Sequence, residues 1–205
     1  MNLQEAINRR RTVREFSEKM VPFEIIERAL EAGLKAPSYN HLKQWNFILV
    51  KDQDKRFALT QTEEMVEEIT DELEQSLDGY DHLVKEMYLD AIPRQKKMIL
   101  EAPELMVVIY KPKTQIFESK KIYDLNCLAS VWCCIENILL SLAEENIFGV
   151  TFIPQNTNAI KKVLCVPQEL EVAAIIPFGY KATNAKIIPQ KEIDLNTKLH
   201  IDNWA

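Results

Sequence analysis

Hydrophobic and polar positions in the first part of the chain predict two helices followed by a strand. The apolar spacing favours a short helix over Leu3–Arg9 and a second helix from Pro22 to just before Pro37. The second helix must end there because a residue that precedes proline avoids helical conformation. The apolar run WNFILV over 45–50 predicts a strand, and the charged residues 51–54 predict a turn after it.

An acidic segment occupies the middle of the chain. Between residues 61 and 90, apolar residues recur at every fourth position and predict one amphipathic helix with a solvated acidic face: Met65, Ile69, Leu73 and Leu77. A site for a partner that recognises acidic residues is the alternative. A second helical stretch is predicted over 83–98, with an interruption at Pro93.

The second half of the chain carries the most apolar elements. Strands are predicted over 105–110, 150–153 and 172–178, and helices over 124–146 and 157–164. The helix over 124–146 has an apolar stripe so wide that it needs cover on more than one side, either at the domain centre or at a subunit interface: Leu128, Val131, Trp132, Ile135, Ile138, Leu139 and Leu142.

Together these elements predict a single domain over 1–205, since neither a repeat nor a flexible linker interrupts them. Helices outnumber strands and separate them, so the expected class is α+β, with layers of helices around a small sheet. The tail after Gly179 has no core-like periodicity. It is either disordered or wrapped onto another surface.

Composition and charge narrow the possible functions. The chain has 205 residues, 47% hydrophobic and 27% charged, which is typical of a globular domain with a real core. Its net charge of −6 argues against nucleic acid as the main partner. We find neither about 20 consecutive apolar residues nor a signal peptide, so we expect a cytoplasmic protein with no membrane partner. The cysteines are expected to be reduced and buried, with a redox pair at Cys133 and Cys134 as the alternative.

The sequence lacks the common motifs for several chemistries. Its four glycines are too far apart for a Rossmann dinucleotide turn or a P-loop, both of which need glycine where the backbone approaches phosphate. The patterns H-E-x-x-H, C-x-x-C and G-x-S-x-G do not occur, and the three histidines are scattered. Metallohydrolase and serine hydrolase activities are therefore poorly supported, and no metal ligand is predicted.

A cluster of arginines at 9–14, RRRTVR, is the first candidate site in this acidic chain. Guanidinium groups with a nearby hydroxyl can bind a phosphate dianion, because arginine offers paired donors in a fixed fork. A solvated basic turn that pairs with the acidic helices is the alternative for the cluster taken alone.

Three consecutive segments resemble the nitroreductase family. They are RRTVREF at 10–16, APSYN at 36–40 and WNFILV at 45–50. The family opens with R-R-S-[VI]-R-x-F, continues with a helix and A-P-S-x-x-N-x-Q-P-W, and then forms a strand. The apolar helix that leads into GVTFIP at 149–154, and FGY at 178–180, agree in kind. The resemblance is weak between residues 59 and 103.

The resemblance implies a nitroreductase-like fold and a homodimer with two FMN molecules at the subunit interface. The sheet would be mainly antiparallel, and the long central helix would lie at the interface. Residues 61–100 would form a helical lid, and the tail over 180–205 would wrap the partner subunit. Carried over by position, the cofactor-binding residues are Arg10, Arg11, Thr12, Arg14, Pro37, Ser38, Asn40, His41, Pro154, Gln155, Asn156 and Lys186.

Individual roles follow from the same resemblance. Arg10, Arg11 and Thr12 would hold the FMN phosphate and ribityl chain together with Lys186. Arg14 would lie at the flavin N1/C2-carbonyl edge. Residues 37–40 would contact the ring from the partner subunit, and the backbone over 154–156 would lie on the ring with an amide near N5.

Two departures from the family pattern leave roles open. Thr12 replaces the usual serine and keeps its hydroxyl, whereas Asn40 lies one or two positions early because N-x-Q-P-W is absent. His41 is therefore either a contact to ring or substrate or only a turn residue. Trp45 is expected to anchor the core rather than to bind substrate.

The implied activity is a two-step oxidoreduction through the flavin. NAD(P)H would pass a hydride to flavin N5 and leave, and a small-molecule electron acceptor such as a nitroaromatic, a quinone or a flavin would then take its place. The catalytic chemistry would belong to the cofactor, with no side chain as a nucleophile. The alternatives are a reductive dehalogenase or dehydrogenase of the same fold, and a flavin-binding protein without turnover.

Overall fold

Four strands form one antiparallel sheet through the middle of the molecule. In the computed structural model, which describes residues 2–204, their order is β1-β2-β4-β3. They cover Trp45–Leu49 (β1), Glu104–Tyr110 (β2), Ile147–Gly149 (β3) and Glu171–Tyr180 (β4). All three pairings are antiparallel. The predicted α+β class, with a small sheet flanked by helices, is confirmed.

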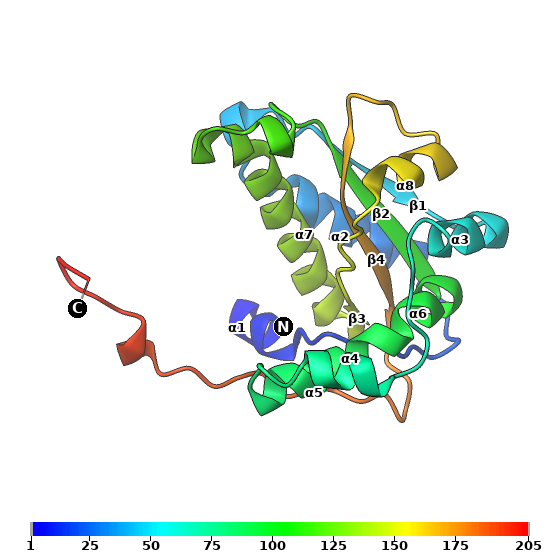
Figure 1. Cartoon of the computed structure of the whole chain (residues 1–205). Helices are drawn as coiled ribbons and strands as arrows, with labels where there is room; N and C mark the ends of the chain where they lie inside the picture. The colour runs from blue at the N-terminus through cyan, green and yellow to red at the C-terminus, as the bar shows by residue number, and fades with distance from the viewer. Residues whose placement is uncertain (1, 205) are drawn as a thin grey trace.

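Helices cover both faces of this sheet (Figure 1). Their bounds are Leu3–Arg9 (α1), Phe23–Leu34 (α2), Gln53–Thr60 (α3), Asp71–Ser76 (α4), His82–Ala91 (α5), Gln95–Glu101 (α6), Asn126–Glu144 (α7) and Thr157–Val163 (α8). Short 3₁₀ turns lie at Tyr39–His41, Ile92–Arg94, Ile116–Glu118, Ile122–Leu125 and Leu195–Thr197.

The sheet separates two hydrophobic cores. Consecutive side chains of a strand point to opposite faces, so the fully buried β2 contributes to both. Met106 and Val108 pack in the core with α2 and α7, whereas Leu105 and Val107 pack in the core with α3, α6 and α8. This cover on both faces explains why the strand is apolar at nearly every position.

Helix α7 is the central helix of the core that it forms with α2, which is one of the two positions that its sequence pattern allows. Val131, Ile135 and Ile138 are almost completely buried. The 122–144 stretch is also long and apolar enough to cross a membrane, which corrects the expectation that no such stretch exists. The helix packs against α2 and the sheet here, which accounts for its apolar face as that of a core helix. Length and composition alone are weak evidence for a membrane span.

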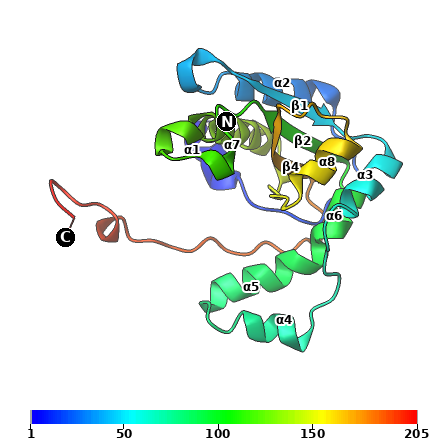
Figure 2. The same ribbon diagram turned by 45° about the horizontal axis from the view of Figure 1, so that its top comes forward.

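The acidic middle segment departs most from its prediction. Instead of one helix over 61–90, residues 61–70 form turns and coil, and two short helices follow. New helix starts explain this, because the Thr70 and Asp81 side chains accept hydrogen bonds from the Leu73 and Val84 amides. Helices α4 and α5 project from the body of the molecule (Figure 2). The predicted interruption at Pro93 is confirmed.

Two other local predictions are wrong. The expected turn over 51–54 contains the start of α3, because the Asp52 side chain caps the Lys55 amide. The expected strand over 150–153 is replaced by β3 at Ile147–Gly149, and Phe152 forms only an isolated bridge to Ile175.

The cysteines and the C-terminal tail complete the fold. All four cysteines are free, but only Cys134 is buried, and Cys133 and Cys165 are exposed. The expectation of buried thiols is therefore wrong for most of them. After β4 the tail follows α5 and then extends away from the body (Figure 1). Several of its apolar side chains are exposed: Ile193, Leu195, Leu199, Ile201 and Trp204.

Candidate functional site

The arginine segment lies in extended conformation between β3 and the end of β4. Thr12 forms a bridge with Gly149, and the Val13 amide donates to the Gly149 carbonyl at 3.4 Å. On the other side, the Ser17 amide donates to the Tyr180 carbonyl at 2.8 Å. Val13 is fully buried. The backbone of the segment is thus fixed on both sides, and its polar side chains are left at the edge of the sheet.

The cations of this segment have weakly held partners. The Arg9 side chain donates to the Asn146 side chain at 2.8 Å, and Arg10 Nε lies 3.2 Å from the half-exposed carboxylate of Glu136. The Arg11 side chain donates to the Arg10 carbonyl at 2.8 Å. Within residues 2–204 the Thr12 hydroxyl has no hydrogen-bond partner. An anionic ligand could therefore bind to Arg10, Arg11 and Thr12 without breaking a fully buried contact.

Arg14 differs from its neighbours because it is nearly buried. Its side chain is 10% exposed, and Nη1 donates to Oδ2 of Asp90 on α5 at 3.1 Å. Burial lowers the pKa of the Arg14 guanidinium, and the charge of Asp90 opposes that effect. Asp90 also pairs with Arg94, whose Nη1 lies 2.8 Å from Oδ1. Arg14 is thereby linked to α5. Residues 71–91, which contain α4 and α5, are called the projecting segment below.

Residues 154–156 form the loop that leads into α8. Pro154 is buried, and the Asn156 side chain caps the Ala159 amide while its Nδ2 donates to the Thr62 carbonyl at 3.0 Å. The Gln155 amide points to both carboxylate oxygens of Glu63 at 3.3 Å. The side chain of Asn156 is therefore used by the fold, whereas the Gln155 amide is held only by the partly exposed carboxylate of Glu63.

The second motif, APSYN, lies after α2 in a region remote from the arginine segment. The Tyr39 amide donates to the Ser130 hydroxyl near the start of α7, whereas Arg9 bonds Asn146 just beyond its end. A helix rises 1.5 Å per residue, so on the order of 20 Å separates these two points. Asn40 and His41 are exposed and have positive φ angles of 49° and 55°. One chain does not bring residues 37–41 together with Arg10–Arg14.

The last predicted site residue, Lys186, lies in the tail. Its ammonium group is 2.8 Å from Oε1 of Glu86 on α5, and this contact lowers the pKa of Glu86. A second tail lysine, Lys191, pairs with Asp81 at 2.6 Å. Lys186 thus contacts the projecting segment, and among the described residues no hydrogen bond or ion pair joins it to the arginine segment.

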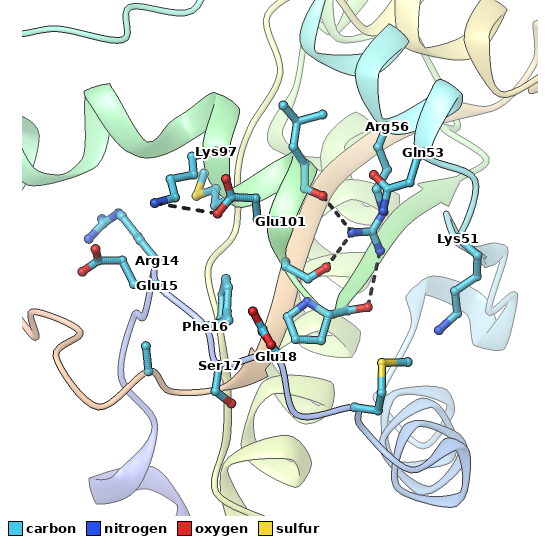
Figure 3. Close-up of a pocket in the computed structure, with 16 residues that line it drawn as sticks. Arg14, Glu15, Phe16, Ser17, Glu18, Lys51, Gln53, Arg56, Lys97 and Glu101 are labelled. Atoms are coloured by element: carbon cyan, nitrogen blue, oxygen red, sulfur yellow. Dashed lines mark hydrogen bonds and ion pairs between the residues drawn. The ribbon is translucent and has the colours of Figure 1, made fainter.

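A cavity of about 720 Å³ lies beside Arg14, between residues 14–20 and α6 (Figure 3). Figure 3 shows the buried Arg56 at its wall, where dashed lines mark bonds to backbone carbonyls, and the Lys97–Glu101 pair near Arg14. Charges of both signs line it, and Arg10, Arg11 and Thr12 do not. Its lining gives no preference for one class of ligand.

The sequence analysis did not identify three carboxylates that contact predicted site residues. Glu63, Glu86 and Asp90 each contact a residue of the predicted site, and all three come from the acidic segment 61–90. In the sequence they are three acidic residues among 31, without a distinguishing neighbour. Only the folded arrangement separates them from the acidic residues that face solvent.

Comparison with known proteins gives one family match and a consistent set of relatives. The profile of the Nitroreductase family matches residues 7–180. An iodotyrosine deiodinase from Haliscomenobacter hydrossis is 25% identical over 88% of this chain and 80% of its own length. Another from Thermotoga neapolitana is 24% identical, with 93% and 95% covered.

Solved structures agree on the fold. An iodotyrosine deiodinase bound to FMN and 3-iodo-L-tyrosine has a TM-score of 0.75 and 22% identity, covering 99% of this chain and 100% of its own. An FMN-dependent nitroreductase from Clostridium difficile has a TM-score of 0.67 and 21% identity, covering 98% and 99%. The shared architecture extends over nearly the whole chain, including the segment 59–103 where the motifs are weak.

Proposed function

The chain belongs to the nitroreductase family, and we propose that it is an FMN-dependent oxidoreductase. In this proposal it takes electrons from NADH or NADPH and passes them to a small organic acceptor, with nitroaromatics, quinones and flavins as the expected classes. The observation that carries the proposal is the extended segment Arg10–Arg14. Its backbone is pinned to Gly149, and its cations have only weakly held partners.

The side chains present fit the phosphate end of FMN. Arg10 and Arg11 would supply charge-assisted hydrogen bonds to the dianion, and the unbonded Thr12 hydroxyl would add a donor. Lys186 would exchange its exposed contact with Glu86 for the phosphate. These contacts are exposed or only partly buried, so their replacement by a phosphate costs little.

The residues proposed for the ring end of FMN would orient the flavin ring. Arg14 would face the N1/C2-carbonyl edge, and the Gln155 amide would leave Glu63 and donate to the ring near N5. When bound, FMN would supply the redox chemistry that connects the nicotinamide to the acceptor. The chain's own residues bind, orient and shield the ring. In this proposal the segment 61–100 is the lid that selects the acceptor.

A complete site needs two copies of the chain in this proposal. Residues 37–41 and Arg10–Arg14 lie near opposite ends of α7. A two-fold dimer with antiparallel α7 helices would place the first group of one chain beside the second group of the other. Leu128, Trp132 and Leu139 of α7 are only partly buried in the single chain, so they are available for such an interface.

Reductive deiodination is the second candidate. It is favoured by the curated relatives, several of which are iodotyrosine deiodinases at 24–28% identity. It uses the same flavin site, so it differs from the first candidate in the acceptor.

The first experiment tests cofactor and reductant together. The purified protein should be yellow, and NADH or NADPH should bleach it without oxygen. A colourless protein that takes up no added FMN would exclude the proposal. Bound FMN that neither nicotinamide reduces would favour a flavin-binding protein without turnover. Reoxidation of the reduced protein by a nitroaromatic or by 3-iodo-L-tyrosine then distinguishes the two candidates.

A second experiment tests the phosphate assignment. Arg10→Ala and Arg11→Ala should weaken FMN binding far more than Arg9→Ala, which serves as the matched control in the same cluster. Removal of one charge-assisted hydrogen bond costs about 2 kcal/mol, so the dissociation constant should rise by about thirtyfold. Equal FMN affinity in all three variants would reject the assignment. Fluorescence titration of the apoprotein with FMN gives the constants.

A further inference from the structure

Asp90 is a buried carboxylate for which the proposed function has no role. It lies near the end of α5, and its side chain is only 3% exposed. Oδ2 accepts a hydrogen bond from Arg14 at 3.1 Å, and Oδ1 lies 2.8 Å from Arg94 Nη1. Arg94 Nη1 donates its hydrogen bond to the main-chain carbonyl of Asp90 at 2.9 Å, so within residues 2–204 Oδ1 has only the ion pair with Arg94 and no hydrogen bond.

The backbone of Arg14 is held in place independently of this carboxylate. Its chain neighbours are fixed by backbone hydrogen bonds, from Val13 to Gly149 and from Ala182 to Glu15. Its side chain is 10% exposed and donates to Asp90 beside the cavity. An asparagine at position 90 keeps a side-chain oxygen that can accept this hydrogen bond, so loss of the charge alone should leave the guanidinium close to where it is.

The charges that face one another here form a neutral group. Arg14 and Arg94 contribute two positive charges, and Asp90 and Glu15 contribute two negative ones, with Glu15 at 3.7 Å from Arg94. A charge between closely spaced groups with little solvent acts strongly on its neighbours. Neutralising Asp90 alone gives this group a net charge of +1.

We propose that Asp90 is a positioning residue that lowers the reduction potential of the bound flavin by partly neutralising Arg14. The inference rests on the proposed function, in which Arg14 faces the N1/C2-carbonyl edge of FMN. A cation there stabilises the negative charge that the ring gains on reduction, and a carboxylate on the far side of that cation opposes the effect. Because Asp90 belongs to α5, the projecting segment contributes to the electron affinity of the cofactor.

The decisive measurement is the midpoint potential of bound FMN, obtained by equilibration with a reference dye. Asp90→Asn keeps the size of the side chain and removes its charge, so the potential should become more positive. We expect on the order of a tenfold change in the reduction equilibrium, or about 30 mV for a two-electron couple. Arg14→Gln should move it in the opposite direction, and Asp90→Glu should stay near the wild type.

Opposite shifts of the midpoint potential in Asp90→Asn and Arg14→Gln distinguish charge tuning from a structural role of Asp90. If Asp90 only held the segment together, Asp90→Asn would either leave the potential unchanged or lower it as Arg14→Gln does, and either result overturns the proposal. Thermal unfolding of the apoproteins shows how much stability each variant loses. If Asp90→Asn does not fold, Arg94→Gln gives a second test. It leaves Asp90 to Arg14 alone and should lower the potential, so an unchanged or higher value counts against the proposal.

The proposed function and the role of Asp90 can be overturned separately. A wild-type protein that binds no FMN overturns both the proposed function and the role of Asp90. A wild-type protein that binds FMN and is reduced by a nicotinamide, but whose potential does not respond to Asp90→Asn, overturns the role of Asp90 alone.

Discussion

Two nearly buried arginines show how the body of the molecule and its projecting segment differ. Arg56 in α3 donates to the backbone carbonyls of Val50 at 2.8 Å and Ala102 at 2.5 Å. Arg14 donates to the carboxylate of Asp90 in α5. Burial lowers the pKa of both guanidinium groups. A carbonyl is a fixed and neutral partner, whereas a carboxylate on a separate segment is a charge that a ligand can compete with.

The surroundings of the two arginines differ in the same way. Around Arg56, the helices α3 and α6 bury apolar side chains such as Leu59 and Ile99 against the sheet. In α4 and α5 the only buried residue is Asp90. The projecting segment is instead joined to the tail and the arginine segment by ion pairs. The body should therefore decide stability, and the projecting segment should decide cofactor affinity and potential.

The largest effect is expected at Arg56. Arg56→Met removes the donors for the Val50 and Ala102 carbonyls and leaves these buried acceptors without partners, each at about 1–3 kcal/mol. We expect a loss of about 3 kcal/mol and a fall in Tm of about 10 °C, measured by thermal unfolding. The control is Arg28→Ala, because the Arg28–Glu145 pair is exposed and its loss should change Tm by little. Similar Tm values for both variants would contradict a structural role of Arg56.

A pair of glycines tests the same contrast by packing. A Cβ at Gly33 in α2 would lie 2.6 Å from Ile138 Cγ1 in the first core, whereas a Cβ at Gly79 in the projecting segment would meet nothing within 4 Å. Neither glycine has a positive φ. Gly33→Ala should therefore cost about 1–2 kcal/mol through overpacking, and Gly79→Ala should be neutral within about 0.5 kcal/mol. Urea unfolding measures both, and equal stabilities would show that α2 and α7 can separate freely.

The contrast also explains which parts of the fold the sequence predicts. The strands over 105–110 and 172–178 lie in a sheet that is covered on both faces, and the helix over 124–146 packs its apolar stripe against α2 and the sheet. Their apolar periodicity is therefore strong, and their positions are predicted well. The segment 61–90 buries few side chains. Its helices begin at the side-chain caps Thr70 and Asp81, and the apolar residues at every fourth position do not reveal these starts. Local pattern is informative where burial is high.

The candidate site is likewise predicted only in part by the sequence. The arginine cluster is visible in the sequence because residue type and spacing carry it. Its partners Asp90, Glu63 and Glu86 are not visible, because each depends on a contact between distant parts of the chain. The separation of residues 37–41 from the arginines is likewise a property of the fold, set by the length of α7.

Two tail lysines test whether the projecting segment holds groups that serve the cofactor. Lys186 and Lys191 each pair with a carboxylate of the projecting segment, Glu86 and Asp81 respectively, but only Lys186 is proposed to bind the phosphate. Lys186→Ala should raise the FMN dissociation constant by about tenfold. Lys191→Ala is the matched control and should leave it unchanged. Equal weakening in both variants would mean that the tail acts through its position and not through one ammonium group.

Alkaline pH should act on the body. Tyr110 is buried in β2, and burial raises its pKa to about 12. The unfolded value is about 10, so the stability that neutral Tyr110 provides is complete below pH 10 and is lost as the pH rises towards 12. Tyr110→Phe should therefore lose less stability than the wild type between pH 10 and 12. Urea unfolding at several pH values tests this, and parallel losses in the two proteins would contradict it.

Acid should act first on the contact between the tail and the projecting segment, with the smallest expected effect. Lys191 lowers the pKa of Asp81, and Lys186 lowers the pKa of Glu86. Because these folded-state values are depressed, the contacts are fully present above the ordinary carboxyl range of about 4 and are lost as the pH falls through the lower values.

Hydrogen exchange can locate this loss. Between pH 5 and pH 3, after correction for intrinsic rates, protection should fall in the first turn of α5, where Asp81 caps the Val84 amide. Protection of β2 should persist, because its amides pair within a sheet covered on both faces. In Lys191→Gln the loss in α5 should begin at a higher pH, because Lys191 no longer lowers the pKa of Asp81. A simultaneous loss of protection in β2 and α5 would show that the projecting segment and the body unfold as one unit.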